Sequence, residues 1–298
     1  MSHPVATIAE PASAISLLSW SLEPAVTLSV VAAATIYWRG WATCARRMPE
    51  RFGPRQVAAF MGGLVTLMLA VCSPIDALAG GLLWAHMIQH LLLMLVAPPL
   101  LWLGAPVAPL LLGMPRPIRR HAARMLAAPA VRRGLAMLAN PAASLATFII
   151  VFWVWHIPAP YDLALTSDLW HHVEHVCFVA AALLFWRPVV LAWPARSPWP
   201  RLAMIPYLIV ADFQNTVLAA VLAFSDHIIY PSYAAGPRPD GLSALDDQAI
   251  AGAVMWLPGS IPFLLPVLCL VIRALVTPAE PSEPRKAIVA ESAPHHVR

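Results

Sequence analysis

The chain has 298 residues, of which 60% are hydrophobic and 11% charged, and its formal net charge is +4. Soluble domains carry about 25% charged residues, so this composition excludes a large soluble protein and predicts one embedded in lipid. The basic residues lie between apolar segments and form no single basic face, which excludes nucleic-acid binding. The four cysteines have no CxxC spacing, which excludes a disulfide framework and a zinc finger.

Seven apolar segments are long enough to cross about 30 Å of hydrocarbon. In chain order they are 20–38, 56–72, 82–102, 142–157, 170–190, 202–224 and 249–275. The sequence therefore predicts an all-α fold, a polytopic membrane helical bundle with seven transmembrane helices. We expect a short outer N-terminal segment at 1–19, the membrane domain at 20–277 and a disordered cytoplasmic tail at 278–298.

Prolines interrupt the third of these segments. Pro98-Pro99 should break or kink it near its end, because proline lacks the N–H and clashes with the preceding turn. The stretch 104–115 that follows is then expected to lie in the membrane interface or to re-enter the bilayer.

The basic residues predict the orientation of the bundle. All of them except Arg238 lie in the last turns of the fifth and seventh segments or in the loops and tail that follow the first, third, fifth and seventh segments. By the positive-inside rule these regions are cytoplasmic, so the N-terminus lies outside and the C-terminus inside. We expect an integral protein of the plasma (inner) membrane, with any site at the opposite ends of the helices facing the periplasm or the cell exterior.

Two histidine pairs open the third and fifth segments, at this outer end. The sequences "HMIQH" (86–90) and "HHVEH" (171–175) both place histidines at i and i+4, on one helix face. His156 ends the fourth segment, Asp76 follows the second, and Met255 lies in the first turns of the seventh. Strongly polar groups in a membrane segment are costly and are usually functional.

A bound metal would compensate that cost, because neutral imidazole is a good metal ligand. The thioethers of Met87, Met94 and Met255 favour Cu(I), since soft sulfur prefers the softer ion. Zinc and haem are less favoured. We expect Glu174 and Gln89 to accept hydrogen bonds from ligand histidines. The candidate metal-binding residues are His86, His90, His156, His171, His172, His175, Asp76 and Met255.

Simpler explanations remain for each of these residues. A histidine at a membrane interface is commonly a hydrated side chain, Asp76 could only cap a turn, and the methionines could be core or lipid-facing. Asp212, near the middle of the sixth segment, could serve only in a hydrogen bond between helices. No catalytic triad or phosphate-binding loop is present in the sequence, so no catalytic residue and no organic cofactor is predicted.

Three long segments resemble the seven-helix CtaG family of cytochrome c oxidase assembly factors. They are "SPIDALAGGLLWAHMIQHLLLMLVAPPLLWLGAP" (73–106), "WHIPAPYDLALTSDLWHHVEHVCFVAAALLFWRPV" (155–189) and "DQAIAGAVMWLPG" (247–259). The resemblance extends over about 20–275 and implies a role in maturing a haem–copper oxidase, with copper delivered to its catalytic subunit. It points to the same histidines, to Asp76, and to Asp247 with Met255.

The leading hypothesis is a non-enzymatic metallochaperone that passes copper by ligand exchange. Its partners would be the catalytic subunit of the oxidase, other copper chaperones and membrane lipid; whether the chain forms a homo-oligomer stays open. One alternative is a histidine-box metalloenzyme of the di-iron hydroxylase kind. Another is a haem-binding or haem-transfer protein, with axial histidines from two neighbouring helices.

Overall fold

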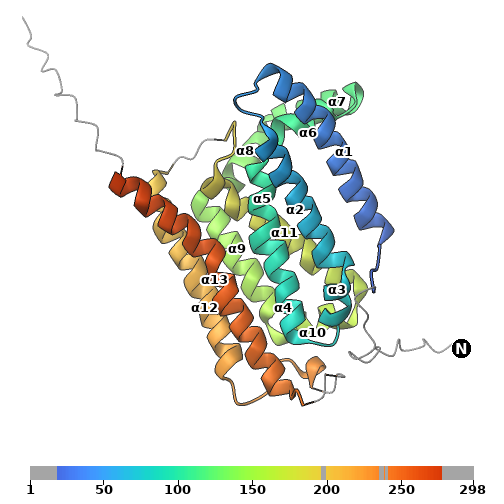
Figure 1. Cartoon of the computed structure of the whole chain (residues 1–298), viewed down its shortest axis with the longest axis vertical. Coiled ribbons are helices and arrows are strands. Elements are labelled where there is room, and N and C mark those ends of the chain that lie inside the picture. The colour runs from blue at the N-terminus through green and yellow to red at the C-terminus, as the bar shows by residue number, and fades with distance from the viewer. Residues whose placement is uncertain (1–18, 196–198, 235–237, 239–240, 277–298) are drawn as a thin grey trace, which may run out of the picture.

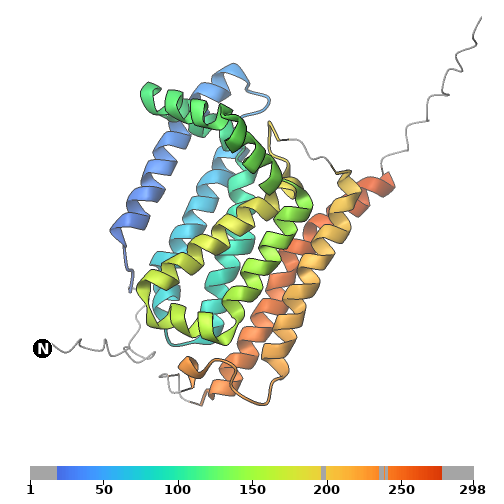
Figure 2. The same cartoon turned by 180° about the vertical axis from the view of Figure 1, so that it is seen from behind.

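The computed structural model describes residues 19–195, 199–234, 238 and 241–276, and within these ranges all regular structure is helical. The predicted outer segment at 1–19 and tail at 278–298 lie almost entirely outside the described residues. Figure 1 shows a bundle in which α12 and α13 run side by side along one edge and α1 along the other. The short helices α3 and α10 lie at one end, and α6, α7 and α8 at the opposite end. Figure 2 shows the same bundle from behind.

The first half of the chain comprises α1 (Pro24–Arg47), α2 (Pro54–Cys72), α3 (Pro74–Ala79), α4 (Leu83–Leu91), the π-helix η2 (Leu92–Val96), α5 (Ala97–Leu103), α6 (Val107–Gly113), α7 (Arg116–Ala127) and α8 (Pro129–Leu138). The second half comprises α9 (Pro141–His156), α10 (Pro158–Thr166), α11 (Asp168–Val190), the 3₁₀ turns η3 (Arg201–Ala203) and η4 (Pro231–Tyr233), α12 (Met204–Phe224) and α13 (Ala244–Val276).

Five helical stretches are long and apolar enough to cross a membrane: Pro54–Cys72, Leu83–Leu103, Asp168–Val190, Arg201–Phe224 and Ala244–Val276. The pair α8 and α9, bent by 69°, makes a sixth if the two form one span. An all-helical membrane bundle is therefore confirmed. The count of seven is not, because α1 begins only at Pro24 and its apolar part ends at Arg39, so it is not among these stretches. Seven spans stay a prediction.

The third predicted span becomes irregular about one turn before the expected break at Pro98-Pro99. The irregular turn is η2, at Leu92–Val96, and the chain stays helical through Pro98 and Pro99. Pro98 cannot donate to the carbonyl of Met94, four residues back. The indole N–H of Trp186 in α11 donates to that carbonyl instead, at 2.9 Å. This is how a proline becomes tolerable inside a membrane helix.

In two pairs of helices, the backbones are in direct contact because a glycine lies at the crossing. A Cβ on Gly40 of α1 would lie 1.7 Å from the carbonyl oxygen of Pro109 in α6, and one on Gly113 would lie 1.7 Å from that of Ile36. Gly252 likewise allows α13 to approach α12 closely, because a Cβ at this position would lie 2.6 Å from the backbone oxygen of Ala219. Small residues at such crossings are typical of membrane helices, whose association depends on close packing. The stretch 104–115 is thus held against α1 through α6.

Gly40→Ala is expected to destabilise the fold by about 3 kcal/mol or more, because the backbones of α1 and α6 must separate. The matched control is Gly134→Ala in α8, where a Cβ would meet nothing within 4 Å. That variant should leave the stability of the fold unchanged or increase it by up to about 1 kcal/mol, because alanine favours a helix more than glycine does. Thermal unfolding of the detergent-purified proteins measures both, and equal unfolding temperatures would contradict the α1–α6 contact.

Candidate metal centre

The site lies where α4 and α11 both begin, at the end of the bundle that also holds α3 and α10 (Figure 1). The start of α4 is fixed by the carboxylate of Asp247, in the first turn of α13, which accepts hydrogen bonds from the backbone N–H groups of Leu83 and Trp84 at 3.0 and 3.1 Å. A carboxylate at a helix N-terminus satisfies donors that have no partner within the helix. Asp247 therefore sets the height at which α4 presents its histidines.

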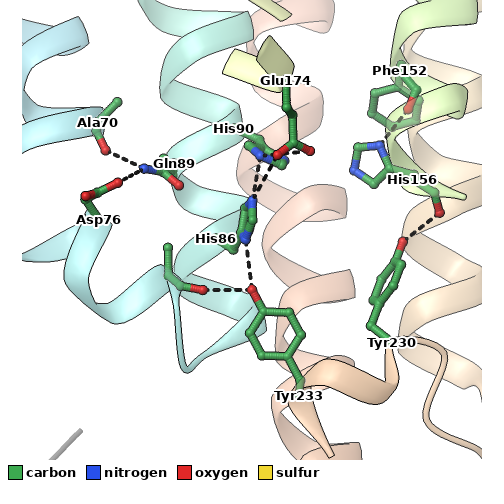
Figure 3. A network of polar contacts seen from close by, with 11 residues as sticks. Ala70, Asp76, His86, Gln89, His90, Phe152, His156, Glu174, Tyr230 and Tyr233 are labelled. Atoms are coloured by element: carbon green, nitrogen blue, oxygen red, sulfur yellow. Dashed lines mark hydrogen bonds and ion pairs between the residues drawn. The ribbon is translucent and has the colours of Figure 1, made fainter. Parts of the chain in front are cut away.

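Four side chains converge between these helices. One ligand atom from each of His86, His171, Glu174 and His175 lies within 4.8 Å of the others. Donors bound to one ion at about 2.0–2.1 Å are at most about 4.2 Å apart, so a small inward movement would bring all four into coordination. His90 adjoins this four-donor cluster, with its Nε2 atom 2.7 Å from that of His86 and 3.7 Å from Glu174 Oε1 (Figure 3).

The cluster holds buried polar atoms that the described protein atoms do not satisfy. Glu174 has no exposed surface, and among the described residues neither carboxylate oxygen has a hydrogen-bond partner. The Nε2 atoms of His171 and His175 are likewise buried without a partner in this part of the chain. A buried carboxylate costs several kcal/mol unless a cation compensates it. Three imidazoles and one carboxylate are a donor set that fits a metal ion such as zinc, iron or copper.

A chain of hydrogen bonds fixes which nitrogen of His86 carries the proton. The hydroxyl of Tyr233 donates to the carbonyl of Ala79 at 2.7 Å. Burial raises the pKa of Tyr233, so this hydroxyl stays protonated. Its oxygen must then accept from Nδ1–H of His86, 2.8 Å away. His86 Nε2 then carries a lone pair, which accepts a hydrogen bond from His90 Nε2 at 2.7 Å and could bind a metal only if that contact opened.

His172 lies outside the cluster. Its Nε2 is 2.8 Å from the carboxylate of Glu23, and its Nδ1 is 2.5 Å from the carbonyl of Asp168. Both partners are acceptors, so both ring nitrogens donate and neither offers a lone pair in this arrangement. His172 as a metal ligand stays a prediction that requires the contact with Glu23 to open.

Asp76 and Gln89 form a separate contact. The Gln89 amide donates to Asp76 at 2.6 Å and to the carbonyl of Ala70 at 2.9 Å, so it ties α4 to α2 and α3 (Figure 3). The amide oxygen of Gln89, which was expected to accept from a ligand histidine, has no hydrogen-bond partner among the described residues. Burial raises the pKa of Asp76, and the hydrogen bond from Gln89 opposes that rise.

A cavity of about 380 Å³ reaches the cluster from the α1 side. His171 and His175 line it, together with Asp76, Glu23 and Asp168. Several carboxylates along one cavity favour the approach of a cation. The two remaining predicted residues, His156 and Met255, line a second and much smaller cavity on the other side of His90.

The sequence analysis underrated Glu174 and missed the tyrosines. Glu174 was expected to assist a ligand histidine, whereas it lies among the donors. Its position, three residues after His171 and one before His175, was the available signal, because residues i and i+3 share a helix face. Nothing local marks Tyr233, which lies far along the chain from His86.

Comparison with known proteins identifies a family. A family model described as cytochrome c oxidase caa3 assembly factor (Caa3_CtaG) matches residues 35–276. Two curated relatives are the uncharacterized proteins Mb0105 of Mycobacterium bovis and MT0111 of Mycobacterium tuberculosis, each 23% identical over 273 residues. The alignment covers 88% of this chain but only 40% of each relative, so the chain spans about two fifths of their length. No solved structure matches.

Glu174→Gln is expected to raise the unfolding temperature of the metal-free protein, by the equivalent of about 1–3 kcal/mol, because it removes an uncompensated buried carboxylate. The same variant should lose the stabilisation that added metal gives the wild type. The control is Glu23→Gln, which changes a half-exposed carboxylate. It should change the free energy of unfolding of the metal-free protein by no more than about 1 kcal/mol. Thermal unfolding with and without Cu(I) measures both, and a destabilised metal-free Glu174→Gln protein would contradict the argument.

Proposed function

The chain belongs to the cytochrome c oxidase caa3 assembly factor family (Caa3_CtaG), and we propose that it binds copper in the four-donor cluster as cargo for the oxidase. The carboxyl group of Glu174, buried among three imidazoles, carries the proposal, since its ionised form is costly unless a cation lies close by. The recipient is the catalytic subunit of a haem–copper oxidase, with other copper chaperones as further partners. The protein acts without catalysing a reaction.

Membrane orientation supports delivery on the outer side. In this proposal α1 completes seven spans, the N-terminus lies outside and the C-terminus in the cytoplasm. The basic helices α7 and α8 then face the cytoplasm, as the positive-inside rule requires, and the four-donor cluster opens to the outer face. Acidic side chains that line the 380 Å³ cavity favour the entry of cations from that side.

Release by ligand exchange suits this donor set. A partner's ligand that enters the cavity meets His171 and His175 first, since both line it, whereas His86 is almost fully buried. The outer two histidines can therefore be replaced one at a time while His86 and Glu174 hold the ion. A cluster without thiolates binds copper less tightly than a cysteine cage would, which favours transfer over storage.

Iron-dependent oxygen chemistry is the second candidate function, because histidine nitrogens with one carboxylate and an accessible side also suit non-haem iron. Metal content of the protein purified from its native membrane distinguishes iron from copper. The haem hypothesis has less support, because it uses only two axial imidazoles and gives no role to the carboxylate of Glu174 among the donors.

Purified protein loaded anaerobically with Cu(I) is expected to retain at least one copper per chain after gel filtration. His171→Ala/His175→Ala should weaken binding by about 100-fold or more, since loss even of a group that only orients a ligand costs 10- to 100-fold. His121→Ala, at an exposed histidine of α7, is the matched control and should bind as the wild type does. In cells, the double variant should fail to restore copper to the oxidase. Retained copper in the double variant would refute the site.

Cysteine labelling tests the orientation. In a Cys177→Ala/Cys269→Ala background, Leu163→Cys in α10 and Ala123→Cys in α7 place thiols at opposite ends of the bundle, both at exposed positions. A membrane-impermeant maleimide added to right-side-out vesicles should label Leu163→Cys and spare Ala123→Cys until detergent is added. The reverse pattern would place the site in the cytoplasm and favour the iron enzyme.

A further inference from the structure

The helices α7 and α8 lie at the end of the bundle that is remote from the four-donor cluster. Figure 2 shows them, in green near the top, lying across the bundle rather than along it. The chain bends by 69° between α8 and α9, so when α9 runs along the membrane normal, α8 lies closer to the membrane plane. No residue of either helix is buried. Both helices therefore present their surface to whatever surrounds this end of the bundle.

This helix pair is strongly basic. Its six arginines, of which all but Arg119 are exposed, are Arg116, Arg119, Arg120, Arg124, Arg132 and Arg133. No acidic residue occurs in the sequence between Asp76 and Asp162, so no carboxylate nearby in the chain can pair with them. Within the described residues, none of the six makes an ion pair or a side-chain hydrogen bond. The described part of the chain thus leaves six positive charges without a partner.

Each helix also carries an exposed apolar stripe. Ile118, Met125 and Leu126 share one face of α7, because positions i, i+7 and i+8 fall together on a helix, and the arginines of α7 lie on its other faces. These three residues are 55%, 53% and 44% exposed. Leu135 and Leu138 form the corresponding stripe of α8, and each is 46% exposed. A basic helix with an exposed apolar stripe is typical of helices that lie in the membrane interface.

The stability of these helices requires a surface to cover the stripes. The helices have 12 and 10 residues, and isolated helices shorter than about 12–15 residues are marginal in water. Most helical stability in proteins comes from packing of an amphipathic face. Since neither helix has a buried residue, the bundle itself supplies little of that packing. A membrane surface would supply it.

Charge and apolar contact together fit a phospholipid with an anionic headgroup. An interfacial helix places its apolar stripe at the boundary of the acyl chains and its basic side chains at the headgroups. Guanidinium groups bind phosphate oxygens through two parallel hydrogen bonds, and a cluster of about four to eight basic residues on an amphipathic helix favours anionic lipid. A soluble polyanion would pair with the arginines but would leave the apolar stripes in water.

We propose that α7 and α8 form a binding surface for anionic phospholipid, with the arginines at the headgroup phosphates and the apolar stripes against the acyl chains. The positive-inside rule requires only that basic residues stay on one side of the membrane. This surface in addition holds lipids of one charge class, because both kinds of contact lie on the same short helices. The proposal does not use the metal site, and the orientation of the bundle decides only which leaflet supplies the lipid.

The test follows thermal unfolding of the full-length protein in a neutral detergent as lipid is added, and native mass spectrometry counts the lipids that stay bound. Phosphatidylglycerol should raise the unfolding temperature more than phosphatidylcholine, since only the first carries a net negative charge. The difference should shrink as salt is added, because salt screens exposed charges. Glycerol phosphate, which has the phosphate but no acyl chain, should stabilise the protein little.

Two pairs of arginine variants separate this surface from general charge. Arg120→Gln/Arg124→Gln, in α7, should weaken the binding of phosphatidylglycerol by about 30-fold. The control Arg46→Gln/Arg55→Gln removes the same charge from exposed positions of α1 and α2 and should bind the lipid as the wild type does. All four changes are at exposed positions, so without added lipid both variants should unfold at the temperature of the wild type.

The apolar stripe is tested by Ile118→Ser/Met125→Ser, which keeps every arginine and should also weaken lipid binding. Equal losses in the two arginine variants would reduce the effect to net charge and overturn the proposal. Phosphatidylglycerol no better than phosphatidylcholine, or glycerol phosphate as effective as the lipid, would overturn it as well. Unchanged lipid binding by Ile118→Ser/Met125→Ser would show that the stripe does not meet acyl chains, and a protein partner would then be the occupant. None of these results depends on copper, so the proposed function is tested separately.

Discussion

A carboxylate is buried in an apolar helical bundle, and the rest of the site is organised around it. Glu174 has no exposed surface, and the nearest basic nitrogens, on His86 and His90, are 3.9 and 3.7 Å away. These distances are too long for hydrogen bonds, so the imidazoles surround the carboxylate without neutralising it. In a medium of low dielectric constant the ionised form of such a group is stable only with a cation close by. The fold therefore keeps a local cost in stability that metal binding would remove.

The histidines of α4 stay beside Glu174 only if α4 is fixed both along its axis and in its rotation about that axis. Asp247 caps its first turn from α13, Gln89 ties one side to Ala70 and Asp76, and Tyr233 reaches His86 from the loop before α13. These contacts come from distant parts of the chain, and each satisfies a group that would otherwise be buried without a partner. The result is a rigid ligand set whose hydrogen-bond directions are also determined, as effective metal sites require.

The third membrane stretch combines this rigidity with an irregular turn. The π-helix η2 follows directly after the turn that carries His90, and π-turns inside helices are frequent at functional sites. Trp186 satisfies the Met94 carbonyl that Pro98 leaves free, so α11 supports the irregular segment from the same face that supplies His175 and Glu174. The candidate metal-binding face of α11 and its packing against the third membrane stretch are thus parts of one helix–helix contact.

The sequence by itself determined what depends on local pattern. Apolar length predicted most of the membrane helices, because hydrocarbon thickness fixes the number of residues needed. The i, i+4 spacing predicted that His86 would face His90, and His171 would face His175, because helix geometry alone sets those directions. The sequence also predicted a first span at 20–38, but α1 begins only at Pro24 and is not among the helices that are long and apolar enough to cross a membrane, so that span stays a prediction.

Only the tertiary structure decided how each helix is rotated and what it meets. Glu174 rather than His172 joins the donors, because packing turns that edge of α11 inward and leaves His172 exposed beside Glu23. Met255 and His156 lie apart from the cluster, since α9 and α13 approach His90 from its other side. Tyr233 sets the tautomer of His86 across a long sequence separation. Such choices follow from contacts between distant segments, which no local pattern encodes.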